Sequence, residues 1–347
     1  MSADGHLTDA ATRHSIYIQR LAGGNLKKVA SFITRAITTA KERISAGLTA
    51  YGTNRYNSQI ETLQSDLASI YGEMKEQAVM DFGDLAEYEL DFSARMLGQV
   101  TKIGVVFNTP SAAMVRAAAL ADPLELEARK GLQRISINGA LDQFGTKKSA
   151  EIIGEIQIGS AMGETSQQIQ RRLTSLHQLQ SDQASSLVRT MTNHIASTAR
   201  MEQLKANDDI LDGWIAIATL DSKTSPYCRS VDQKWFPFDA PKPPFHWHCR
   251  TSFIPRLKPE YAREIKGSTR PSIGSGGVEM VSSKTSYQEW LGRQSAEFQK
   301  DVLGPNRYAL FSKGELTLDK FVDDAGRTLT LKQLREREAD AFDKAGL

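Results

Sequence analysis

The chain has 347 residues, of which 40% are hydrophobic and 24% are charged. This composition is that of a folded globular protein and excludes general disorder. The net charge of +2 excludes a polycationic nucleic-acid coat, and two cysteines exclude a disulfide-rich secreted scaffold. We expect no membrane span, because no apolar run approaches the ~20 residues that a span needs. The polar N-terminus also lacks the apolar core of a signal peptide, so we expect synthesis in a reducing compartment.

The first segment, 1–100, is predicted to form a helical hairpin. Apolar residues recur every three or four positions in two runs, which places each run on one stripe of a helix. The runs are Val29, Ile33, Ile37, Ala40, Ile44 and Leu48, then Tyr56, Ile60, Leu63, Leu67, Ile70 and Met74. Gly47, Gly52 and Asn54 lie between them and favour a turn. We expect the stripes to pack against each other, with a coiled-coil surface for a partner as the alternative.

The second segment, 101–209, is predicted to continue this helical body. The short β-branched run QVTKIGVVF at 99–107 indicates a strand or an extended crossover. Residues 125–160 again show helical spacing of apolar side chains. A stop and a start at GSAMGETS then precede further helices, the last over 181–204.

The character of the sequence changes at residue 210. The run GWIAIATL is strand-like, and we predict a small α+β module over 210–266. Glycine and serine dominate the following stretch, which predicts a linker over 267–284. The segment 285–347 is predicted as a helical tail, with helices over 287–302 and 331–344. The expected fold is mostly α, with an elongated helical body and a small α+β module around a Cys/His cluster.

Both cysteines and two of the six histidines lie close together in the sequence. Zinc prefers four nitrogen or sulfur ligands in a tetrahedron, and the H-x-x-C spacing of His246 and Cys249 supplies two. Cys228 is a third candidate, and the fourth is His248, Asp221 or missing. Two alternatives stay open. The cysteines are buried small apolar residues, or they form a disulfide, which a reducing compartment disfavours.

Other catalytic signatures are absent from the sequence. It contains no P-loop, no G-x-G-x-x-G, no G-x-S-x-G and no H-E-x-x-H. Asp221 and Asp232 lie near the cysteines, which makes a metal-assisted hydrolase an alternative. A single aspartate beside a turn is more often a turn residue.

The charge is uneven along the chain. Segment 221–270 has ten Lys and Arg against five Asp and Glu. Such an excess predicts non-specific contact with DNA phosphates, for which Arg250, Arg256 and Lys258 are the candidates. The alternatives are a solvated basic rim and a surface for an acidic protein partner.

The residues around the cluster resemble a known family. The run WIAIATLDSKTSPYCRSVDQK, followed by HWHCRT, is similar to the phage head morphogenesis proteins of the Mu F-like family. The shared elements are D-x-x-T-x-x-x-C and a later H-x-x-C-R. They fall on Asp221, Thr224, Cys228, His246, Cys249 and Arg250. Ser225 and Thr251 stand where many relatives carry cysteines. The resemblance covers roughly 100–335.

The resemblance implies a minor capsid protein and not an enzyme. Such a protein is made in the host cytoplasm and resides in the virion, in the head interior or at the portal vertex. It assists head assembly, DNA packaging or DNA delivery, in several copies. The implied partners are the portal protein and the major capsid protein, with non-specific DNA contact. The alternative function is a metal-dependent nuclease or hydrolase that acts on packaged DNA.

Overall fold

The computed structural model describes residues 3–128, 131–265, 267–323 and 325–347. Over these residues it has eleven α-helices and three small antiparallel sheets. The predicted class, mostly α with a small α+β module around a Cys/His cluster, is confirmed. None of the described helices combines the length and the apolar character that a membrane-spanning helix requires.

The chain forms two compact units, each assembled from separate stretches. Unit 1 comprises Met1–Ile18, Glu89–Ser111 and Arg200–Leu347. Unit 2 comprises Gln19–Tyr88 and Ala112–Ala199.

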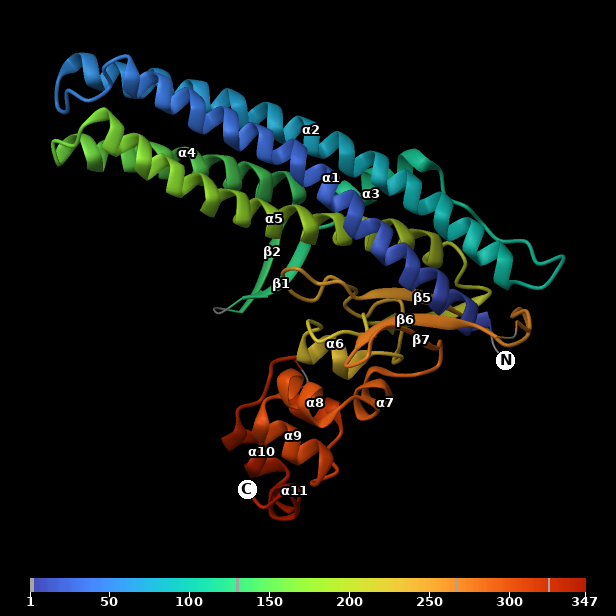
Figure 1. Cartoon of the computed structure of the whole chain (residues 1–347). Coiled ribbons are helices and arrows are strands. Elements are labelled where there is room, and N and C mark those ends of the chain that lie inside the picture. The colour runs from blue at the N-terminus through green and yellow to red at the C-terminus, as the bar shows by residue number, and fades with distance from the viewer. Residues whose placement is uncertain (1–2, 129–130, 266, 324) are drawn as a thin grey trace. The chain divides into compact units, whose positions relative to one another are not determined.

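Unit 2 is built from long helices (Figure 1). These are α4 (Ile137–Ala161), the short α3 (Ala112–Ala121) and the greater part of α1 (Ala3–Ser45), α2 (Asn54–Val100) and α5 (Ser166–Lys205), whose remaining residues belong to unit 1. Within this unit α1 and α2 lie side by side and antiparallel, as the ion pairs Arg35–Glu73 and Arg43–Asp66 show. The apolar stripes predicted in both runs are buried, except for Ile60, which is half-buried.

The region 125–160 differs from its helical prediction. Residues before α4 form an antiparallel hairpin of β1 (Leu124–Ala128) and β2 (Gly131–Ile135). At the start of this region the side chains alternate as in a strand, because Leu124 and Leu126 are buried and Glu125 is exposed. Ser136 then begins α4 as an N-cap, with its hydroxyl accepting from the backbone N–H of Gly139.

Unit 1 contains a three-stranded sheet in the order β4-β3-β5. Its strands are β3 (Leu211–Ile217), β4 (Trp235–Phe236) and β5 (Ser252–Leu257), and α6 (Pro226–Val231) lies between β3 and β4 in the sequence. The strand predicted from GWIAIATL is confirmed as β3. Trp214 is fully buried at its centre, stacked on Phe236, and its indole N–H donates to the Pro237 carbonyl. For 99–107 the prediction is a strand or an extended crossover. The first two of these residues belong to α2, which ends at Val100, and the rest form an irregular connection before α3.

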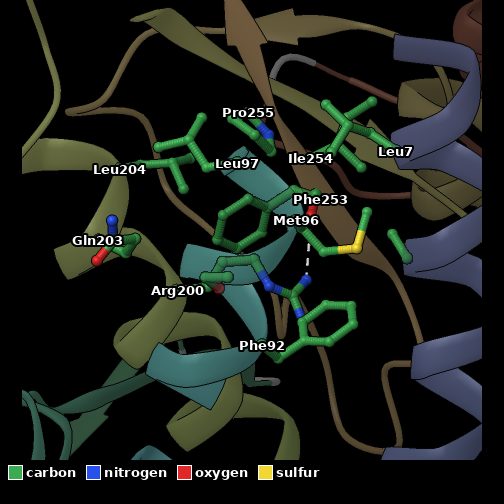
Figure 2. A pocket seen from close by; sticks show the side chains of 12 residues that line it. Leu7, Phe92, Met96, Leu97, Arg200, Gln203, Leu204, Phe253, Ile254 and Pro255 are labelled. Carbon is green, nitrogen blue, oxygen red and sulfur yellow. Dashed lines mark hydrogen bonds between the residues drawn. The ribbon is translucent and has the colours of Figure 1, made fainter. Parts of the chain in front are cut away.

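A buried cation lies in the core of unit 1. Figure 2 shows Arg200 between the rings of Phe92 and Phe253, beside a cavity of about 20 Å³. Its guanidinium donates to the Phe253 carbonyl at 3.1 Å and to a Glu89 carboxylate oxygen at 2.8 Å. The other oxygen of Glu89 is bonded to the His14 ring. Arg200 thus joins α5 to α2 and to β5.

The linker predicted over 267–284 is wrong. This stretch forms an antiparallel hairpin of β6 (Thr269–Gly274) and β7 (Gly277–Ser282). Arg270 in β6 is completely buried and pairs with Asp232 at 3.0 Å. Glycine and serine indicate flexibility only where no tertiary contact fixes the chain, and here the buried ion pair does so.

The C-terminal residues form a small helical cluster within unit 1. Its elements are α7 (Tyr287–Gly292), α8 (Ala296–Leu303), α9 (Pro305–Ser312), η1 (Leu318–Phe321), α10 (Leu331–Arg337) and α11 (Ala339–Ala345). Each of the two helices predicted here is therefore two shorter ones. Ser295 interrupts the first as the N-cap of α8, and Glu338 interrupts the second. Trp290 and Tyr287 anchor the shared core.

Candidate metal centre

Local signals place Cys228 and Cys249. Ser225 is the N-cap of α6, and its hydroxyl accepts from the backbone N–H of Cys228 at 3.3 Å. Pro226 follows at the first helical position, where its missing N–H costs nothing. On the opposite side a turn returns the Cys249 N–H to the His246 carbonyl at 3.1 Å, just before β5. The helix start and the turn bring Cys228 and Cys249, which are 21 positions apart in the sequence, next to each other.

The structure brings together the three predicted ligands Cys228, His246 and Cys249. Their ligand atoms lie within 4.8 Å of one another. The Cys228 sulfur is 3.2 Å from His246 Nε2 and 3.8 Å from the Cys249 sulfur. Both thiols are buried and the imidazole is half-buried. A covalent S–S bond measures about 2.05 Å, so the disulfide alternative is wrong for this structure.

The imidazole of His246 is oriented for coordination. Its Nδ1 is 2.8 Å from the Trp247 carbonyl oxygen. Because a carbonyl only accepts, Nδ1 carries the hydrogen, and in the neutral ring the lone pair lies on Nε2. That nitrogen faces the Cys228 sulfur and the Ser225 hydroxyl. Such a hydrogen bond behind a histidine is the usual support for a metal ligand.

The two thiols have opposite pKa shifts. Burial raises the pKa of Cys249, but the hydrogen bond from Cys228 and the interaction with the protonated form of His246 outweigh it and hold the pKa well below its ordinary value. The hydrogen bond to Cys249, together with burial, raises the pKa of Cys228. Of the two thiols, Cys249 therefore loses its proton more readily. The thiolate is the form that binds metal ions.

Neither candidate for the fourth ligand belongs to this group of atoms in the described part of the chain. Asp221 forms a bidentate ion pair with Arg250, at 2.6 and 2.9 Å. Its carboxylate also accepts from the hydroxyl of Thr224 and the backbone of Lys223. His248 is exposed, in a left-handed backbone conformation with φ of 60°. Among the described residues, three potential ligands therefore lie together.

The aspartates considered for a hydrolase have structural partners. Asp232 accepts from the backbone N–H groups of Ala218 and Tyr287, both at 2.7 Å, and from Arg270. With Asp221 paired to Arg250, neither carboxylate is available as a general base. The sequence offered no signal for the partner Arg270, which lies in a stretch rich in glycine and serine.

The three basic residues proposed for DNA contact all bond to their own chain. Arg250 is paired with Asp221 and is 29% exposed at its side chain. Arg256 lies 3.6 Å from Asp212 and over the ring of Trp235, and it stays 45% exposed. The ammonium of Lys258 donates to the carbonyls at 208 and 209. Arg256 therefore keeps the most accessible charge of the three.

Comparison with known families identifies one segment. Residues 151–254 match the family model described as Phage Mu protein F like protein. This segment runs from within α4 to β5 and contains both motifs of the cluster. The match over these residues agrees with the family that the motifs indicate. Searches of curated proteins and of solved structures find no match for the chain.

Proposed function

We propose that the chain is a minor structural protein of a tailed-phage head, bound at or near the portal vertex. The observation that supports this function is the match of residues 151–254 to the Phage Mu F-like family. In that role it assists head assembly, DNA packaging or DNA delivery. The long helices of unit 2 are the proposed contact with the portal protein and the major capsid protein.

The test is to locate the protein in heads of the phage that encodes it. Mass spectrometry of purified heads should find several copies, and cryo-EM should show density at one vertex that a deletion mutant lacks. Mutant particles should assemble or fill with DNA poorly. Absence of the protein from purified heads would contradict the proposal.

We further propose that Cys228, His246 and Cys249 bind zinc. Two sulfurs and one imidazole nitrogen are ligands that zinc prefers, and the carbonyl behind His246 gives the support such sites have. The ion would fix α6 to the loop before β5, which is a structural role. Water or a ligand from another molecule would complete the tetrahedron.

The proposed role is non-enzymatic, and the nuclease alternative has a direct test. A hydrolytic site needs a general base near the metal, and both nearby aspartates are held by arginines. Incubation of the purified chain with duplex DNA and Mg²⁺ or Zn²⁺ should leave the DNA intact. Cleavage that is lost in the Cys249→Ser variant would establish the nuclease instead.

Contact with DNA stays a proposal for the basic segment 221–270. Phosphate contacts carry no sequence information, so binding should be equal for unrelated duplexes and should weaken with salt. Arg256→Ala should reduce the slope of the logarithm of the binding constant against the logarithm of the salt concentration by about one. Arg293→Ala, an exposed arginine outside the segment, is the control. A strong sequence preference, or equal slopes for both variants, would leave the segment as a surface for protein.

A further inference from the structure

A cavity of about 110 Å³ lies in unit 1, between α6, the end of α8, the start of α9 and η1. Its walls combine five apolar side chains with two arginines. They are Pro226, Val302, Leu303, Leu318, Phe321, Arg229 and Arg307. Thr328, which is exposed, also lines the cavity and connects it to solvent.

In the described part of the chain neither arginine has a carboxylate partner, and Arg229 lies over the ring of Tyr287. Among the described residues, no carboxylate oxygen comes within 4.0 Å of either guanidinium. Arg229 donates to the carbonyls of Val302 and Ser222, and Arg307 donates to the carbonyl of Leu329. The Nε of each arginine is buried without a hydrogen-bond partner in the described structure. Asp221 acts on Arg229 from a longer distance but is already paired with Arg250.

Two half-buried cations beside apolar walls are costly unless an anion joins them. A carboxylate is the anion that fits. Its two oxygens match guanidinium donors, and an aliphatic body would cover the leucine and valine side chains. Most of the described lining residues are apolar, which favours a ligand with an aliphatic body over inorganic phosphate, which has none.

We propose that this cavity binds a small aliphatic carboxylate, presented by the C-terminus of a partner peptide or by a free acid. The described lining includes none of the three cluster residues, although Arg229 follows Cys228 in α6, and the inference does not depend on the proposed role in the phage head. Arg307 is the main recognition residue. Its guanidinium makes one hydrogen bond to the described chain, whereas Arg229 makes two and also ties α6 to the end of α8.

Titration of the full chain with isovalerate, followed by calorimetry or NMR, tests the site. We expect saturable millimolar binding. Isovaleramide, which has the same shape without the charge, should bind at least about tenfold more weakly. Arg307→Gln should lower the affinity for isovalerate by about the same factor. Arg293 is an exposed arginine outside the cavity, so Arg293→Gln should bind isovalerate as the parent does. Equal binding of the acid and the amide, unchanged binding by Arg307→Gln, or tighter binding of inorganic phosphate would each overturn the proposal.

A second variant separates binding from folding. Thr328→Trp fills the entrance and leaves both arginines in place, so it should abolish isovalerate binding with an unchanged circular dichroism spectrum. Full binding by this variant would show that the acid binds elsewhere. A tripeptide that ends in leucine distinguishes the two sources. If it binds more tightly than isovalerate, and its amidated form does not, the ligand is a peptide C-terminus. If isovalerate binds more tightly, it is a free acid.

Discussion

Asp232 holds together three parts of unit 1 that are distant in the sequence. Its carboxylate accepts from the end of β3, from β6 and from the first residue of α7. Both Asp232 and Arg270 have fully buried side chains. Removal of one member of a buried ion pair is strongly destabilising, because the other charge is left without a partner.

Asp232→Asn should therefore lower the free energy of unfolding of unit 1 by about 3–5 kcal/mol. Urea denaturation followed by tryptophan fluorescence measures this, since Trp214 and Trp290 both lie in that unit. Asp239→Asn, an exposed aspartate of the same region, is the control and should change the value by less than about 0.5 kcal/mol. Similar losses in both variants would mean that the buried pair has no special role.

The two histidines beside Cys249 give a matched test of zinc binding. His246 faces both sulfurs, whereas His248 lies outside the group. Purified His246→Ala should lose most of its zinc, and His248→Ala should keep it. A chelator should also speed hydrogen exchange in 210–260 before it affects the helices of unit 2, because metal binding and local folding are linked. Equal zinc content in both variants, or exchange unaffected by chelator, would leave the cysteines as packing residues.

At the scale of elements, the α1–α2 hairpin is stabilised by its buried stripe. Ion pairs along its edges, such as Arg35–Glu73, are about half exposed and contribute little because water screens them. Leu63 and Leu67 of α2 are completely buried, so removal from water is the dominant favourable contribution.

Leu67→Ala should lower the free energy of unfolding of unit 2 by roughly 2–5 kcal/mol, because it leaves a cavity in the helix interface. Ser65→Ala, at an exposed position on the same helix, should have almost no effect. Chemical denaturation followed by helical circular dichroism gives both values. An equally small loss for Leu67→Ala would place this stripe outside the core.

The sequence predicts elements where the signal is local. Apolar spacing predicted helix within α1, α2 and α5, but it did not predict that α1 begins at Ala3 or that α5 is one continuous helix from Ser166 to Lys205. The clustering of thiols and imidazoles located Cys228, His246 and Cys249. It missed the hairpin over 124–135, where the strand period covers only a few residues. It also missed Arg270, whose burial depends on Asp232, 38 positions away. Local patterns contain no information about such partners.

At the scale of the whole molecule, one buried charge cluster joins distant parts of unit 1. His14 of α1 and Arg200 of α5 both bond to the carboxylate of Glu89 in α2. Burial raises the pKa of Glu89, but the opposing effects of Arg200 and His14 outweigh it and leave the pKa below its ordinary value. In the sequence His14 is 75 positions and Arg200 is 111 positions from Glu89, so no local motif could indicate the cluster.

Acid should weaken unit 1 through this cluster. The pKa of Glu89 is lower in the folded protein than in the unfolded chain, where it is about 4.3. The ionised carboxylate therefore makes its full contribution to the free energy of unfolding above this pH, and the contribution is lost as the pH falls through the folded pKa. Glu89→Gln should therefore cost about 3–5 kcal/mol at pH 7, and its difference from the parent should shrink below about pH 4. Urea denaturation at a series of pH values measures this. A difference that is independent of pH would show that the carboxylate charge is not what stabilises the unit.

The interleaved order of the two units affects how the protein is made. Leu7 and Ala11, near the start of the chain, pack in the same core as Trp214 and Phe253. At 5–20 residues per second, roughly ten to fifty seconds of translation separate the first of these from the last. During that interval the N-terminal apolar residues lack their final neighbours. Closure of unit 1 is therefore a late step with long-range contacts, of the kind that folds slowly. A fragment that starts at Arg200 would lack core residues of unit 1 such as Leu7 and Ala11.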